Sequence, residues 1–141
     1  MGNILDMQFM RYLNLFSRIT GVQTTVCFVY NTIIVFGVKE RDMSLAIGRG
    51  AENVKRISEI LRRKIKIVGM PSGNGPKDIE HFIKEVVAPL SFTKFDFQNG
   101  IVTLSGSMQN KAGLIGRNSV RLKELEEILK RYFDVSELKV I

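Results

Sequence analysis

Apolar residues recur at helical spacing in two stretches of the chain. Within residues 6–20, Phe9, Leu13 and Phe16 share one helix face, and Gly21 follows as a stop signal. A second stripe of the same kind occupies residues 78–90: Ile79, Phe82, Ile83, Val86, Val87 and Leu90. Each stripe predicts an amphipathic helix with one buried face.

The pattern after each stripe predicts a hairpin, two helices and a final strand. In the first half we expect strands over 25–30 and 32–38, helices near 43–47 and over 51–64, and a strand over 65–68. In the second half we expect strands over 92–97 and 101–104, helices near 111–115 and over 119–131, and a strand over 138–141. Asn99-Gly100 is the strongest hairpin signal in the chain. The order α-β-β-α-α-β, present twice, indicates an α+β fold with a three-stranded sheet covered by helices in each copy.

The two halves are an internal repeat. Shifting the sequence by 68 residues gives 8 identities in the 17 positions from 47 to 63, and it also places Ile33 on Ile101. The identical pairs are Ile47/Ile115, Gly48/Gly116, Arg49/Arg117, Lys55/Lys123, Glu59/Glu127, Ile60/Ile128, Leu61/Leu129 and Arg63/Arg131. The match ends before the last strand, where the second copy has a few extra residues. Residues 71–76 lack apolar side chains and are rich in Gly and Pro. We therefore expect two domains, 1–70 and 77–141, joined by a linker at 71–76.

Composition restricts the class of protein. The 141 residues are 45% hydrophobic and 25% charged, which is typical of a folded chain and not of a disordered one. No apolar run is long enough for a membrane helix, and the first residues do not resemble a signal peptide, so we expect no membrane partner. Cys27 is the only cysteine; we expect it to be buried, with no disulfide, and a cytoplasmic location is consistent with it.

Positive charge is concentrated in the first half. The net charge is +7, of which residues 1–70 carry +6, from 11 basic and 5 acidic side chains. A basic surface of this kind favours a nucleic acid or another anionic partner. From Arg49 to Lys66 the net charge is +5, whereas the matching helix of the second copy, from Arg117 to Arg131, has +2. The basic residues at 62–64 could equally form a solvated helix face.

A glycine-containing loop between two predicted helices carries the candidate chemistry. The segment Ile47-Gly48-Arg49-Gly50-Ala51 precedes a helix, so it would combine backbone amides, a helix N-terminus and a guanidinium group, which together suit a phosphate. Such a loop is often only a turn. Its recurrence as Ile115-Gly116-Arg117-Asn118-Ser119 favours the phosphate-binding interpretation.

The order of elements and this loop resemble the KH domain in its prokaryotic (type II) arrangement. KH domains clamp about four nucleotides of single-stranded RNA beside a Gly-x-x-Gly loop. Two such units in so short a chain, with the string from Leu45 to Arg56 and the string Arg131-Tyr132-Phe133-Asp134-Val135, are similar to the archaeal NusA family. The resemblance covers nearly the whole chain. It implies a transcription termination/antitermination factor that lacks the flanking domains of bacterial NusA.

The loops depart from the family pattern at the fourth position, where Ala51 and Ser119 replace Gly. The second loop also has Asn118 where the first has Gly50, and Asn tolerates left-handed backbone better than most residues. We therefore expect the first loop to be the stronger RNA contact. The expected RNA-binding residues are Ile47, Gly48, Arg49, Gly50, Ala51, Asn53, Lys55, Arg56 and Lys66 in the first copy, and Ile115, Gly116, Arg117, Asn118, Ser119, Arg121 and Lys123 in the second.

The expected partners are single-stranded RNA, as the nascent transcript, and RNA polymerase. Two alternatives stay open: a protein-interaction module that docks on polymerase, and an RNA-binding factor in ribosome assembly or RNA processing. His81 is the only histidine, and the sequence has no Walker motif or metal-ligand cluster, so we expect no enzymatic activity, metal, cofactor or small-molecule substrate. Base readout would involve apolar residues beside each loop and the backbone of the last strand of each copy.

Overall fold

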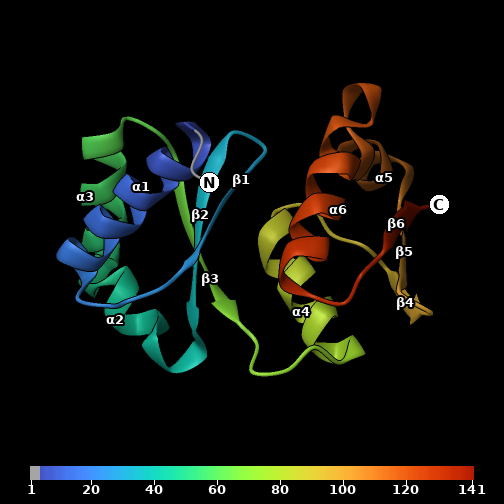
Figure 1. Cartoon of the computed structure of the whole chain (residues 1–141). Helices are drawn as coiled ribbons and strands as arrows, with labels where there is room; N and C mark the ends of the chain where they lie inside the picture. Colours follow the sequence, from blue (N-terminus) through green and yellow to red (C-terminus); the bar gives the residue numbers. More distant parts are fainter. Residues whose placement is uncertain (1–3) are drawn as a thin grey trace. The chain divides into compact units, whose positions relative to one another are not determined.

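The computed structural model describes the backbone of residues 4–141 and the side chains of residues 7–141. The chain divides into two compact units, Met1–Met70 and Pro71–Ile141. Each unit contains one three-stranded sheet and three α-helices (Figure 1). The fold is therefore α+β with two similar halves, an arrangement consistent with tandem KH-like domains.

Unit 1 follows the order α-β-β-α-α-β. Its elements are α1 (Ile4–Thr20), β1 (Val26–Tyr30), β2 (Ile33–Lys39), the 3-10 turn η1 (Glu40–Asp42), α2 (Met43–Ile47), the 3-10 turn η2 (Arg49–Ala51), α3 (Glu52–Leu61) and β3 (Ile65–Met70). Strand β2 lies in the centre of the sheet, antiparallel to β1 and parallel to β3. Strand β3 is therefore an edge strand, and the loop η2 lies between two helices that contact the sheet.

The core of unit 1 lies between its helices and one face of its sheet. The helices lie on one side of β1–β3 (Figure 1). Phe16 of α1 and Phe36 of β2 stack with ring centroids 4.4 Å apart, and both are fully buried. Ile57 of α3 and Ala46 of α2 complete this core. Cys27 is buried in the same cluster, as the sequence predicts. The apolar faces on both sides of the loop thus fix the angle at which α2 and α3 meet.

Unit 2 repeats this order of elements. They are α4 (Pro76–Val87), β4 (Lys94–Gln98), β5 (Ile101–Ser105), α5 (Met108–Ile115), the 3-10 turn η3 (Arg117–Ser119), α6 (Val120–Tyr132) and β6 (Glu137–Val140). Strand β5 is central, antiparallel to β4 and parallel to the edge strand β6. Phe82, Leu104 and Leu125 are fully buried representatives of its core.

Several helix boundaries differ from the sequence expectation, and α4, for example, ends at Val87 rather than at Leu90. Helix α3 ends at Leu61 rather than near Lys64, because Arg62 turns into a left-handed conformation with φ 54°. The Ser58 hydroxyl then donates to the Arg63 carbonyl at 2.7 Å and fixes this turn. Helix α4 begins at Pro76, the residue expected to end the linker. A proline suits the first turn of a helix because its missing N–H has no helical partner there.

Helix α5 begins three residues earlier than expected. Ser107 caps it: the Asn110 backbone N–H donates to the Ser107 hydroxyl at 3.2 Å. Among the described residues, no helix is both long and apolar enough to cross a membrane.

Candidate nucleic-acid interface

The two inter-helix loops have the same backbone conformation. Gly48 has φ 81° and ψ 166°, and Gly116 has φ 74° and ψ 172°. The third loop position, Gly50 or Asn118, has φ 60° or 56°, in the left-handed region. The sequence repeat therefore extends to the detailed shape of the loop.

Glycine is retained at the first loop position for a steric reason. The φ and ψ of Gly48 and Gly116 lie in a region that is essentially restricted to glycine. A Cβ at Gly48 would also lie 2.9 Å from the Glu52 Cγ, and one at Gly116 would lie 2.9 Å from the Arg121 Cγ. At Gly50, by contrast, a Cβ would meet nothing within 4 Å. This contrast explains why the second loop can hold Asn at the third position but keeps Gly at the first.

The residue two positions after each loop braces it. The Asn53 side-chain amide donates to the Leu45 carbonyl of α2 at 3.2 Å and so joins the two helices across the loop. Arg121 takes the same place in unit 2, where its aliphatic stem lies against Gly116 and its guanidinium group pairs with Glu124. Both residues were expected to bind RNA directly. The structure gives them these positioning contacts.

The first loop leads into an open groove along unit 1. This groove lies between α3 and the edge strand β3 and has a volume of about 480 Å³. Its lining consists of Ile33, Val54, Lys55, Ser58, Glu59, Lys64, Ile65 and Lys66. Three lysines against one glutamate give this lining a net charge of +2. An apolar floor between lysine ammonium groups suits the two parts of a nucleotide, because bases have apolar faces and phosphates are anionic.

The edge strand presents backbone groups to the groove. The Ile34 N–H donates to the Lys64 carbonyl at 3.0 Å, so Lys64 directs its backbone towards β2. Successive residues of a strand direct their backbone N–H and C=O groups to opposite sides. The backbone groups of Ile65 and Ile67 therefore point away from β2. This arrangement agrees with the expectation that the last strand of each copy is an edge that could form hydrogen bonds with bases.

The structure brings several of the expected RNA-binding residues together. Lys55 and Lys66 line the same groove, from α3 and β3, and Arg49 is exposed at the loop that precedes α3. Arg56 is exposed on α3 but does not line the groove, and Ile47 is half-buried. In unit 2, Arg117, Asn118 and Lys123 are exposed, and Ile115 and Ser119 are half-buried.

Sequence reasoning missed four residues of the groove: Ile33, Ser58, Glu59 and Lys64. The retained pair Ile33/Ile101 was a usable signal for Ile33. Lys64 was assigned to a possible solvated face because helix α3 was expected to continue through it. Outside the groove, His81 is exposed on α4 and its Nε2 lies 2.6 Å from a Glu85 carboxylate oxygen.

Comparison with known proteins gives this geometry a context. No protein-family model matches the chain. Two curated proteins, each named "Probable transcription termination protein NusA", are similar to it. The one from Methanocaldococcus jannaschii is 26% identical over 133 residues, covering 92% of this chain and 70% of that protein. The one from Methanococcus vannielii is 28% identical over 133 residues, covering 92% of this chain and 74% of that protein.

A solved structure has the same fold over nearly the whole chain. The crystal structure of APE1850 matches with a TM-score of 0.65 and 26% sequence identity, covering 96% of this chain and 99% of the other. Fold and loops thus define a protein of two similar α+β units, each with a glycine-containing loop between two helices. The chain is NusA-like: it resembles archaeal proteins of that name over nearly its full length. Those names suggest a transcription termination factor and point to a non-enzymatic role.

Proposed function

We propose that the chain binds single-stranded RNA through two type II KH domains and acts in transcription termination or antitermination. The domains are residues 1–70 and 77–141, with the linker at 71–76. The nascent transcript is the proposed ligand, and RNA polymerase is the proposed protein partner. Both partners are inferred from the names of the relatives, which describe termination proteins.

One observation supports this proposal above the others: helix α3 begins at the loop of unit 1 and lines the basic groove with its first turns. Loop residues 48–51 end where α3 begins, and Lys55, one turn further on, already lines the groove. A strand of RNA could therefore place phosphates at the loop and bases in the neighbouring groove. The same combination of loop and groove is typical of KH domains.

The binding mechanism follows from the chemistry of the loop and of the groove of unit 1. The N-terminal end of the α3 dipole lies at the loop and favours a phosphate there, while the Ala51 and Glu52 N–H groups already donate to the Gly48 and Arg49 carbonyls. Arg49 adds a charged donor, and the lysines of the groove neutralise further phosphates. Apolar side chains such as Val54 and Ile65 contact the faces of bases. Backbone groups of β3 can contact base edges.

Unit 1 is the proposed main site. The stretch from Arg49 to Lys66 carries +5, against +1 for the matching stretch from Arg117 to Lys139. Each phosphate contact contributes mainly through counterion release, so the more basic unit should bind a single strand more tightly.

Binding of a short single-stranded RNA, measured by fluorescence anisotropy over a range of salt concentrations, tests the proposal. A duplex of the same length serves as the comparison. We expect the single strand to bind more tightly than the duplex. The logarithm of the association constant should fall with the logarithm of salt with a slope of about −2 to −3, as for three or four phosphates. No binding, or equal binding of the duplex, would contradict the proposal.

A further inference from the structure

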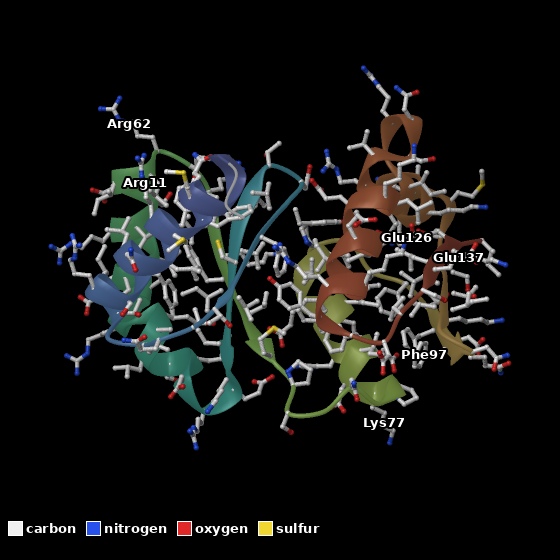
Figure 2. All side chains as sticks on the ribbon, viewed as in Figure 1. Arg11, Arg62, Lys77, Phe97, Glu126 and Glu137 are labelled. Atoms are coloured by element: carbon white, nitrogen blue, oxygen red, sulfur yellow. The ribbon has the colours of Figure 1, made fainter. Side chains whose placement is uncertain are left out.

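A glutamate on helix α6 of unit 2 accepts a hydrogen bond from the edge strand of the sheet. The Leu138 backbone N–H of β6 donates to Glu126 Oε2 of α6 at 2.9 Å. The other oxygen, Oε1, lies 3.7 Å from the Lys130 Nζ, and the Glu126 side chain is only 24% exposed. Figure 2 marks Glu126 on α6 and Glu137 on β6. Both carboxylate oxygens of Glu126 therefore have a partner.

The N–H that Glu126 holds belongs to the outward-facing set of an edge strand. Within the described residues 4–141, strand β6 is paired only with β5, and the Ile141 N–H donates to the Leu104 carbonyl at 2.9 Å. Residues 139 and 141 therefore direct their backbone towards β5, and Leu138 directs its N–H away from the sheet. This N–H is the group that a base would need in order to bond with the strand.

Unit 1 differs at this position. Glu126 matches Ser58 at the repeat offset of 68, and the Ser58 hydroxyl donates to the Arg63 carbonyl. The pairing of the strands shows independently that Ile65 of unit 1 is the counterpart of Leu138. Ile65 pairs with Ile34, and Leu138 pairs with the matching Val102. Unit 1 thus has a short hydroxyl beside its groove where unit 2 has a carboxylate bonded to the strand.

The net charge of the groove residues is also less favourable for RNA in unit 2 than in unit 1. The positions of unit 2 that match the groove of unit 1 are Ile101, Leu122, Lys123, Glu126, Glu127, Glu137, Leu138 and Lys139. They contain two lysines and three glutamates, a net charge of −1, against +2 for the lining in unit 1. A surface of this charge repels a phosphate backbone, whereas the loop of unit 2 keeps the shape of the first loop.

We propose that Glu126 closes the base-binding edge of unit 2, and that this residue restricts single-stranded RNA to the groove of unit 1. The inference rests on the proposed RNA-binding function and names the residue that makes the two copies unequal. For RNA to enter the second groove, the Leu138 N–H must exchange its carboxylate acceptor for a base. The carboxylate must then face the incoming phosphates. Both requirements oppose binding.

The test is an NMR titration of the whole chain with a short single-stranded RNA of mixed sequence, followed through backbone amides. In the parent protein we expect the amides of Ile65 and Ile67 to shift and those of Leu138 and Val140 to stay in place. In Glu126→Ser, which copies Ser58, the amides of Leu138 and Val140 should shift too. Hydrogen exchange at Leu138, measured without RNA, should become at least about tenfold faster in this variant, because its acceptor is gone.

Two matched variants separate the bond from the charge. Glu127→Ser removes the same charge one residue further on, from a side chain that is 75% exposed. Glu126→Gln removes the charge but keeps an oxygen that can accept from Leu138. We expect the β6 amides to stay unresponsive to RNA in both variants. With Arg49→Asp in the background to weaken unit 1, Glu126→Ser should tighten RNA binding by about fivefold, which corresponds to about 1 kcal/mol.

The outcomes distinguish this inference from the function on which it rests. If amides of β3 and β6 both shift in the parent protein, the second groove is open and the role of Glu126 is wrong, while RNA binding stands. If Glu126→Ser leaves Leu138 exchange or the β6 response unchanged, the role of Glu126 is also wrong. If no amide of either strand shifts in any variant, the proposed function itself fails, and this inference fails with it.

Discussion

Ala51 and Ser119 occupy the same place in the two loops, and both have a left-handed backbone. Ala51 has φ 60° and ψ 30°, and Ser119 has φ 61° and ψ 24°. This conformation costs a residue with a Cβ on the order of 1 kcal/mol or more, a cost that glycine does not have. The helices on each side hold the loop in shape despite this cost, because their apolar faces are fixed in the core.

Replacing Ala51 with Gly should therefore stabilise the protein. We expect Ala51→Gly to raise the free energy of unfolding by about 1 kcal/mol, because the left-handed conformation is no longer strained. Urea denaturation followed by circular dichroism measures the change. The matched control is Ala112→Gly, at an exposed position of α5 with helical backbone, which should lower the free energy of unfolding by about 1 kcal/mol. Equal destabilisation by both variants would contradict the strain at Ala51.

The first and third loop positions should respond differently to a side chain. Gly48→Ala should cost about 1–3 kcal/mol of stability, because Gly48 has a backbone conformation that is essentially glycine-only. It should also weaken RNA binding. Gly50→Asn should change stability by less than about 0.5 kcal/mol, since Asn tolerates left-handed backbone and the space at Gly50 is open. Thermal unfolding of the two variants makes the comparison, and an equal loss in both would refute this account of the loop.

The first hairpin turn carries strain that the second avoids. Asn31 and Thr32 have φ 52° and 65°, and the matching Asn99 and Gly100 have φ 53° and 80°. A β-branched residue is an outlier in this region, so Thr32→Gly should raise the free energy of unfolding by about 1 kcal/mol. The Arg63 guanidinium bond to the Thr32 carbonyl, at 2.8 Å, involves only backbone on the Thr32 side and should persist. A melting temperature at or below that of the parent would disprove the prediction.

Much of the fold could be predicted from the sequence because its signals are local. The spacing of Phe9, Leu13 and Phe16 predicts a helix, and Asn99-Gly100 predicts a hairpin; the structure has both. The end of α3 could not be predicted in this way. Arg62 gives no local stop signal, and the turn depends on the bond from Ser58 to the Arg63 carbonyl.

The parts of the candidate site in which both copies keep the same residue could be predicted from the sequence. The parts in which the copies differ could not. Gly48 and Gly116 could be identified because one steric requirement acts on both. The bond from Leu138 to Glu126 could not, because the last strand of unit 2 is displaced within the repeat. Ile34 matches Val102 at an offset of 68, whereas their strand partners Ile65 and Leu138 are 73 residues apart. Five extra residues therefore hide the correspondence until the strands are paired.

Charge reversal in each loop tests most directly whether RNA binds mainly through the loop and groove of unit 1. Arg49→Asp and Arg117→Asp make the same change at matching, exposed positions, so each is the control for the other. Salt-dependent binding to a short single-stranded RNA should show a loss of about tenfold or more for Arg49→Asp and a salt slope reduced by about 1. Arg117→Asp should lose less than about threefold, or about 0.7 kcal/mol. Equal losses, or a larger loss from Arg117→Asp, would contradict the dominance of unit 1. Indifference to both would contradict RNA binding through these loops and favour a protein-docking role.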